Sequence, residues 1–280
     1  MEKLSLEARI KAEIYNFSGR VGLYVNDFKG NIVEINSEEK FETASTVKVF
    51  ILAELYRQIY EKKLTAEDIL TYNKEHYVVG SGVLRAMDFG VQLTVKNFAI
   101  LMIIVSDNIA TNVLIDLLGI DNINNTCNDL GLKNTVIHNR IDFDSYDKLG
   151  TTTPKDYGKI FEMIHNKELW SQELSTQIFE ILKNQHYNTI LTKKLPQYFL
   201  DSEDTGEEEL IYIASKSGSM DNCRNDGGIV HTPCGEYVVS IFTKDFKDKL
   251  YYQEHESYRF GSCISRLLFD QYLSLNGRMK

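Results

Sequence analysis

Residues 45–60 read STVKVFILAELYRQIY, a short polar start followed by an apolar run whose positions recur at helical spacing. Ser45 stands at the polar start and Lys48 follows three positions later, so both side chains lie on one face of the predicted helix. The apolar residues that follow indicate that this helix is buried. The stretch therefore predicts a serine at the first turn of a buried helix, with a lysine directed into low dielectric.

Strand and helix signals alternate on either side of this helix. Residues 20–26 and 31–36 are short β-rich runs joined by a polar turn, which predicts a hairpin. From residue 46 to about 185 the apolar positions keep helical spacing. Strand signals return within residues 210–243, and a last helix is predicted over about 257–274.

This order of elements predicts the fold class. We expect an α/β (α+β) chain in which the hairpin and the later strands form one antiparallel sheet, flanked by the terminal helices, with a helical block inserted as a second lobe. The α/β lobe comprises about residues 1–40 and 205–280, and the all-α lobe about 41–204. Because no repeat or Pro- or Gly/Ser-rich linker divides the chain, residues 1–280 are predicted to be a single domain with a cleft between the lobes.

The composition favours a globular protein with a small-molecule or peptide partner. Of 280 residues, 43% are hydrophobic and 25% charged, which is enough apolar material for a sizeable core. The net charge of -9 argues against a nucleic-acid partner, since such surfaces cluster lysine and arginine. The longest apolar run, residues 98–105, is far shorter than the roughly 20 residues that span a bilayer, so we expect a buried helix and no membrane span.

The amino terminus and the cysteines bear on location and cofactors. Residues 1–17 resemble an amphipathic helix and lack the apolar core of a signal peptide, so the chain as it stands is expected in the cytoplasm, or outside the cell if a leader was removed. The four cysteines form no CxxC pair and have no histidine at zinc spacing. We expect free thiols in a reducing compartment, no metal, no cofactor and a monomer.

Serine and lysine at this spacing point to nucleophilic chemistry, because a desolvated lysine can remove the serine proton near neutral pH. The S-x-x-K pattern occurs three times, starting at Ser37, Ser45 and Ser145. Ser37 and Ser145 sit in polar stretches typical of solvated turns, whereas Ser45 precedes an apolar helix whose free N–H groups favour negative charge. The alternative is that Ser45 only caps the helix while Lys48 reaches solvent.

Two further tripeptides place polar groups in apolar surroundings. In Ser106-Asp107-Asn108, the serine could relay a proton and the Asn108 amide could hold both Lys48 and a substrate carbonyl. Lys216-Ser217-Gly218 ends a predicted strand, where the lysine could attract an anionic substrate and the glycine would let a substrate approach the backbone. Either tripeptide alone could instead be a polar helix end or a basic strand end.

The chain resembles the class A β-lactamase-like family of penicillin-recognising serine hydrolases. The resemblance lies in three motifs in the same order: S-x-x-K on a helix start, S-D-N on an inter-helix segment and K-[T/S]-G on a strand. The resemblance covers nearly the whole chain and extends to residues 93–95, 110–112 and 151–154. It implies that Ser45 forms the acyl-enzyme, that Lys48 is a general base and that Ser106 shuttles protons.

The same resemblance implies how a substrate is held. Asn108 would position it, and Lys216 with Ser217 would receive its carboxylate. The backbone N–H groups of Ser45 and Ser219 would form an oxyanion hole.

The chain departs from the family at the step that releases the acyl group. Class A enzymes hold the hydrolytic water with an omega-loop glutamate, but here no glutamate occurs between Glu75 and Glu162. Asp142 is the nearest substitute and Asp144 the second, and an aspartate is one methylene shorter, which can misplace the water. We therefore expect acylation to outrun deacylation. Arg224 could add a guanidinium for a substrate carboxylate, or be an exposed strand-turn arginine.

Three functions are compatible with these motifs. The first is a serine β-lactamase, an enzyme that opens the β-lactam amide through an acyl-enzyme on Ser45. The second is a penicillin-binding D,D-peptidase, esterase or amidase with slow deacylation, whose partner is a D-Ala-D-Ala-type peptide. The third is a non-catalytic binding protein that kept the cleft and lost the chemistry.

Overall fold

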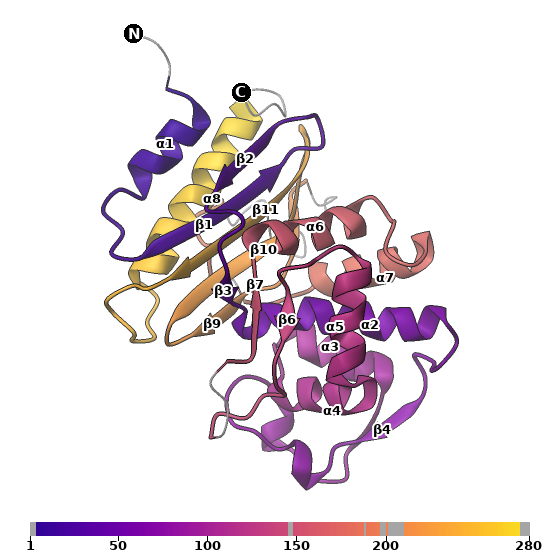
Figure 1. Cartoon of the computed structure of the whole chain (residues 1–280). Helices are drawn as coiled ribbons and strands as arrows, with labels where there is room; N and C mark the ends of the chain where they lie inside the picture. The colour runs from indigo at the N-terminus through magenta and orange to yellow at the C-terminus, as the bar shows by residue number, and fades with distance from the viewer. Residues whose placement is uncertain (1–3, 145–147, 188, 197–199, 201–209, 275–280) are drawn as a thin grey trace.

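The first and last parts of the chain meet in one antiparallel sheet (Figure 1). A computed structural model describes residues 4–144, 148–187, 189–196, 200 and 210–274. The strand order is β2-β1-β11-β10-β8, and the short β9 also pairs with β10. The strands are β1 (Arg20–Asn26), β2 (Ile32–Ile35), β8 (Tyr212–Ser215), β9 (Gly218–Met220), β10 (Cys223–Thr232) and β11 (Gly235–Lys244).

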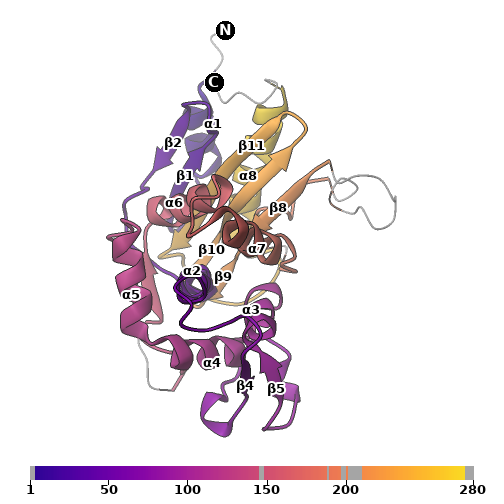
Figure 2. The same ribbon diagram turned by 90° about the vertical axis from the view of Figure 1, so that its right-hand side faces the viewer.

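Helices cover both faces of this sheet. The terminal helices α1 (Leu6–Glu13) and α8 (Glu256–Ser274) pack together on one face, over a core that includes Leu23 and Ile241. Helix α6 (Pro154–His165) covers the other face (Figure 2). A Cβ atom at Gly158 would come within 2.3 Å of the Tyr24 ring, so only glycine lets α6 pack this closely on β1.

Helix α2 (Val47–Tyr60) forms the centre of the inserted lobe and is buried along most of its length. Its neighbours are α3 (Val95–Ile104), α4 (Asn108–Leu118), α5 (Ile120–Asp129) and α7 (Gln172–Lys183). Short 3₁₀ turns η1 (Ala44–Thr46), η2 (Lys74–His76) and η3 (Leu84–Ala86) join these helices to the loops. Within the described residues, no helix is both long enough and apolar enough to cross a membrane.

The structure confirms the predicted fold class, an antiparallel sheet between terminal helices with an inserted helical block. The all-α description of residues 41–204 was wrong, because this block also contains two small antiparallel sheets. One is β3 (Phe41–Glu42), β7 (Gly150–Thr152) and β6 (Val136–Ile137), and the other is β4 (Ile69–Thr71) with β5 (Gln92–Thr94). Strands of two or three residues are too short to show a twofold alternation of apolar residues.

Candidate active site

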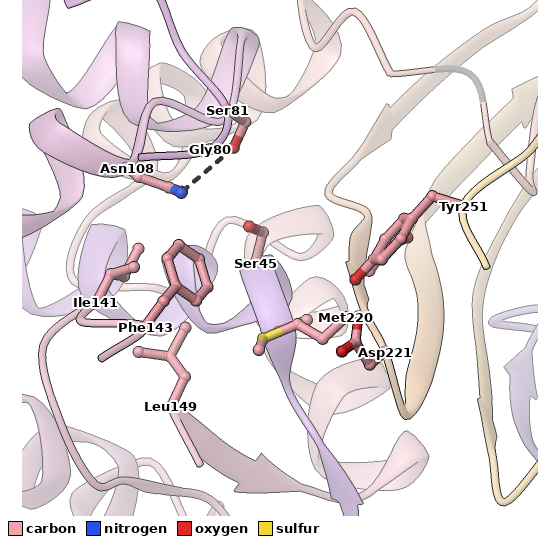
Figure 3. Close-up of a pocket in the computed structure, with 12 residues that line it drawn as sticks. Ser45, Gly80, Ser81, Asn108, Ile141, Phe143, Leu149, Met220, Asp221 and Tyr251 are labelled. Atoms are coloured by element: carbon pink, nitrogen blue, oxygen red, sulfur yellow. Dashed lines mark hydrogen bonds between the residues drawn. The ribbon is translucent and has the colours of Figure 1, made fainter. Parts of the chain in front are cut away.

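Ser45 lies in η1, the single 3₁₀ turn that leads into α2. Ala44 just before it has a φ of 46°, a left-handed conformation that costs energy for a non-glycine residue and is common at functional sites. The Thr46 N–H donates to the Thr43 carbonyl, 3.2 Å away, and closes this turn. Ser45 is half-buried and lines two adjoining cavities (Figure 3).

Lys48 is fully buried, and its amino group joins α2 to the segment between α3 and α4. Its Nζ lies 2.7 Å from the Ser106 carbonyl, 2.9 Å from Ser106 Oγ and 2.9 Å from Asn108 Oδ1. Burial lowers the pKa of Lys48 well below its usual range, and the charge of Lys216 lowers it further, against the opposing charge of Asp107. The structure therefore brings Lys48, Ser106 and Asn108 together around an amine that loses its proton readily.

Asp107 builds the turn that presents Ser106 and Asn108. Its Oδ1 accepts the N–H groups of Ile109 and Ala110 and caps α4. Its Oδ2 accepts the N–H groups of Val83 and Leu84, 2.6 and 2.9 Å away. This middle residue of the tripeptide is therefore structural, and it fixes the loop before η3 against the site.

Ser81 is a site residue that the sequence reasoning missed. Its hydroxyl donates to the Ser106 carbonyl at 2.7 Å and to Asn108 Oδ1 at 3.2 Å, and it lines both cavities that contain Ser45. It lies between Gly80 and Gly82, and a Cβ atom at Gly82 would overlap the Asp107 carboxylate at 2.2 Å. The Gly-Ser-Gly pattern was the available signal, because it marks a loop that must approach another backbone closely.

Lys216 follows β8 and lies behind the wall of the cavity. It is fully buried, and its Nζ donates to the Ser217 carbonyl at 2.8 Å. Burial lowers the pKa of Lys216 to about 7, against the opposing charge of Asp226. Burial also raises the pKa of Asp226, to about 6, although the carboxylate accepts the N–H groups of Leu191 and Gly227. The sequence reasoning did not single out Asp226, which supplies negative charge near Lys216.

The strand that follows Lys216 packs directly against Ser45. Ser217, Gly218 and Ser219 all line the cavity that holds Ser45. A Cβ atom at Gly218 would lie 2.7 Å from both the Ser45 and the Thr46 backbone nitrogens. Glycine was predicted here to admit a substrate, and the structure adds that glycine is needed for β9 to pack against η1.

Asp142 and Asp144 lie in a third cavity, beside the one that contains Ser45. That cavity is also lined by Glu75 and Asn112, and Asp142 Oδ1 accepts the Asp144 N–H at 3.0 Å. The neighbours Ile141 and Phe143 line this cavity and also reach the Ser45 cavity, where Figure 3 shows them on one side of Ser45. The structure therefore does not bring Asp142 into the cavities that contain Ser45.

Arg224 was wrongly predicted to bind a substrate carboxylate, and it is not an exposed turn residue either. It is fully buried, and its guanidinium donates to the Cys223 carbonyl at 2.9 Å and to the Lys249 and Leu250 carbonyls at 3.4 and 3.3 Å. Its Cζ lies 4.2 Å from the centre of the Tyr251 ring, and Tyr251 lines both Ser45 cavities. Arg224 therefore stands behind the cavity wall.

Ser37, which starts another S-x-x-K pattern, is not part of this site. Ser37 lies in a turn as predicted, but it is buried rather than solvated, and its carbonyl accepts the Lys155 N–H. Ser145 lies outside the described residues. Of the two S-x-x-K patterns whose serine the structure describes, the one at Ser45 is joined to Ser106, Asn108 and the strand after Lys216.

A family model described as the β-lactamase enzyme family matches residues 5–272 of the chain. The fold is similar to that of a β-lactamase from Sphaerobacter thermophilus, with a TM-score of 0.85 and 27% identity over 98% of this chain and 99% of that one. A variant of PBP-A solved as an acyl-enzyme complex with penicillin G has a TM-score of 0.82 and 26% identity over 96% of each chain.

A class A β-lactamase from Mycobacterium abscessus has a TM-score of 0.81. Its identity is 18% over 95% of this chain and 99% of that one, so it supports the fold alone.

Proposed function

The chain belongs to the β-lactamase enzyme family, and we propose that it is a serine hydrolase that opens β-lactam amides through an acyl-enzyme on Ser45. One observation carries the proposal. Lys48, one turn along α2 from Ser45, is a buried amine with a depressed pKa whose contacts are Ser106 and Asn108. A buried amine that is neutral near pH 7 can act as a base for a serine hydroxyl.

The contacts of Lys48 suggest how the proton travels. A neutral amine has two hydrogens and one lone pair, and three oxygens surround Nζ. The Ser106 carbonyl and Asn108 Oδ1 can only accept, so they take the two hydrogens and leave the lone pair free for the Ser45 proton. The ammonium that results can donate its third hydrogen to Ser106 Oγ, as the Ser106 hydroxyl gives up its own proton. A proton that Lys48 takes from Ser45 can then pass through Ser106 to the lactam nitrogen as the amide bond breaks.

The substrate would be held on both sides of Ser45. The backbone N–H groups of Ser45 and Ser219 would stabilise the oxyanion, at about 3 kcal/mol for each donor. Asn108 would hold the acyl amide, and the carboxylate would bind at Ser217 with the Lys216 cation behind it. Since the charges of Lys48 and Lys216 repel each other, a cationic Lys216 also keeps Lys48 neutral.

The release step separates two versions of this function. We propose that Asp142 assists the hydrolytic water, but its place in the neighbouring cavity makes release slow. A penicillin-binding D,D-peptidase, esterase or amidase is therefore the second candidate, favoured by the apolar Ile141 and Phe143 side chains where a water would have to sit. A variant of PBP-A, 26% identical to this chain, has been solved as an acyl-enzyme complex with penicillin G, which supports a long-lived acyl-enzyme on this fold.

A mass-spectrometric time course tests the proposal. The protein and its Ser45→Ala variant are mixed with penicillin G, and intact mass and the modified peptide are followed. We expect an adduct on Ser45 in the wild type and none in the variant. Rapid return to the unmodified mass favours a β-lactamase, and a persistent adduct favours the second candidate. No adduct with any β-lactam would refute both and leave a binding protein.

A further inference from the structure

Tyrosine rings surround one of the two cavities described above that contain Ser45. This tyrosine cavity, of about 430 Å³, is lined by Tyr187, Tyr251, Tyr252 and Tyr258 together with Ser45 and Ser217. Tyr251 is 58% exposed and Tyr252 is 42% exposed. Large aromatic rings gathered around a cavity at this exposure are typical of a binding surface, because each offers a flat apolar face to a ligand.

The rings are fixed in place before any ligand arrives. The Arg224 guanidinium lies 4.2 Å from the Tyr251 ring centre and holds the preceding loop through the Lys249 and Leu250 carbonyls. Tyr252 donates its hydroxyl to Asp248 at 2.5 Å, and the Tyr258 hydroxyl lies 2.9 Å from Ser219 Oγ. A wall fixed in this way loses little conformational entropy when it contacts a ligand.

Charge and position decide which part of a substrate meets these rings. The described residues that line the tyrosine cavity are uncharged, while the cations Lys216 and Arg224 lie behind the wall. Ser217, to which the proposed function assigns the substrate carboxylate, lines this cavity and is absent from the lining of the other one. Figure 3 shows Tyr251 and Phe143 on opposite sides of Ser45. The tyrosines therefore face the carboxylate side of a bound substrate.

We propose that the tyrosine cavity is a subsite for a planar aromatic group attached on the carboxylate side of the acyl donor, with Tyr251 and Tyr252 as its specificity-determining residues. Arg224 is a positioning residue that acts through Tyr251. The orientation of the substrate in this subsite rests on the proposed function. The preferred substrates are thus anionic acyl donors that carry an aryl group beyond the scissile amide.

Nitrocefin and cephalothin test this subsite, because they share the same acyl side chain and differ at C3, next to the carboxylate, where only nitrocefin carries an aryl group. Their equilibrium affinities are measured by calorimetry on the Ser45→Ala variant, which cannot be acylated. We expect nitrocefin to bind about three- to tenfold more tightly than cephalothin, as one aromatic contact provides. Adding Tyr251→Leu or Tyr252→Leu should bring the ratio close to one.

Phe143→Leu is the matched control, since it removes an exposed ring from the opposite cavity and should leave the ratio unchanged. Three outcomes would overturn the subsite. They are equal affinities of nitrocefin and cephalothin for Ser45→Ala, an affinity ratio that neither tyrosine substitution lowers, and no binding of either compound. Thermal unfolding of each variant checks that the fold is intact. Acylation of the wild type is scored separately, so a protein that shows the ratio but is never acylated loses the proposed function and keeps the subsite.

Discussion

The charge of Lys216 should set the alkaline limit of acylation. Burial lowers the pKa of its amine to about 7, so the cation is present below this pH and is lost as the pH rises through it. In the proposed function, the substrate carboxylate needs that cation. Replacing Lys216 with arginine keeps a positive charge at every working pH, because a guanidinium titrates only above about 12. Lys216→Arg should therefore remove the alkaline limb of the pH profile.

The size of the effect follows from the pKa. At pH 9, about two units above it, roughly 1% of the Lys216 amine is charged, so the second-order acylation rate constant for penicillin G should fall about 100-fold below its value with Lys216 charged. Lys48 works in the opposite direction, because it must be neutral, and produces the acidic limb. The assay is quenched-flow mass spectrometry between pH 5 and 10 at substrate concentrations far below saturation.

The methyl ester of penicillin G is the matched control, since it has no carboxylate for Lys216 to attract. With this ester the wild type should lack the alkaline limb and keep the acidic one. An alkaline limb near pH 7 that is the same in Lys216→Arg, or that persists with the ester, would refute the assignment of this limb to Lys216.

Substitutions at three further residues test other parts of the site. Ser106→Ala should slow acylation by about 10²- to 10⁴-fold, because it removes the proton relay, and an unchanged adduct rate by mass spectrometry would exclude that relay. Asp107→Ala should lower the free energy of unfolding in urea by about 2 to 3 kcal/mol, because four N–H groups lose their acceptor; a loss under 0.5 kcal/mol would contradict this. Asp142→Asn should slow deacylation far more than acylation, and Asp142→Glu should speed turnover. A deacylation rate in Asp142→Asn equal to that of the wild type would move the role of assisting the hydrolytic water to Asp144 or Lys48.

The long elements of this fold are visible in the sequence, and its short ones are not. Helix α2 and strands β10 and β11 are long enough for their apolar periodicity to be read, so the sheet and the central helix were predicted. The two- and three-residue strands around the cleft show no such period. They form because backbone groups of distant segments need partners, as in the pairing of Phe41 with Thr152.

The candidate site, like the fold, has parts that the sequence predicts and parts that it does not. Ser45, Lys48, Ser106 and Asn108 could be predicted to act together because each belongs to a short motif. The burial of Arg224 could not be predicted, because it depends on Tyr251, which comes from a loop after the next strand. The position of Asp142 could not be predicted either, because it lies in an irregular loop where only Ile141 and Phe143, among its described neighbours, also reach the Ser45 cavity.

The packing of Gly218 against Ser45 has a consequence for how the protein is made. Ser45 and helix α2 are synthesised early, but the strand that packs against Ser45, and the partner strands β10 and β11, emerge from the ribosome late. The sheet cannot close until β11 pairs with β1, which joins residues from opposite ends of the chain. Such distant pairings form slowly, so a nascent or carboxy-terminally truncated chain carries Ser45 without Ser219, the proposed oxyanion donor, and we expect it to be inert. Activity therefore reports the completion of folding.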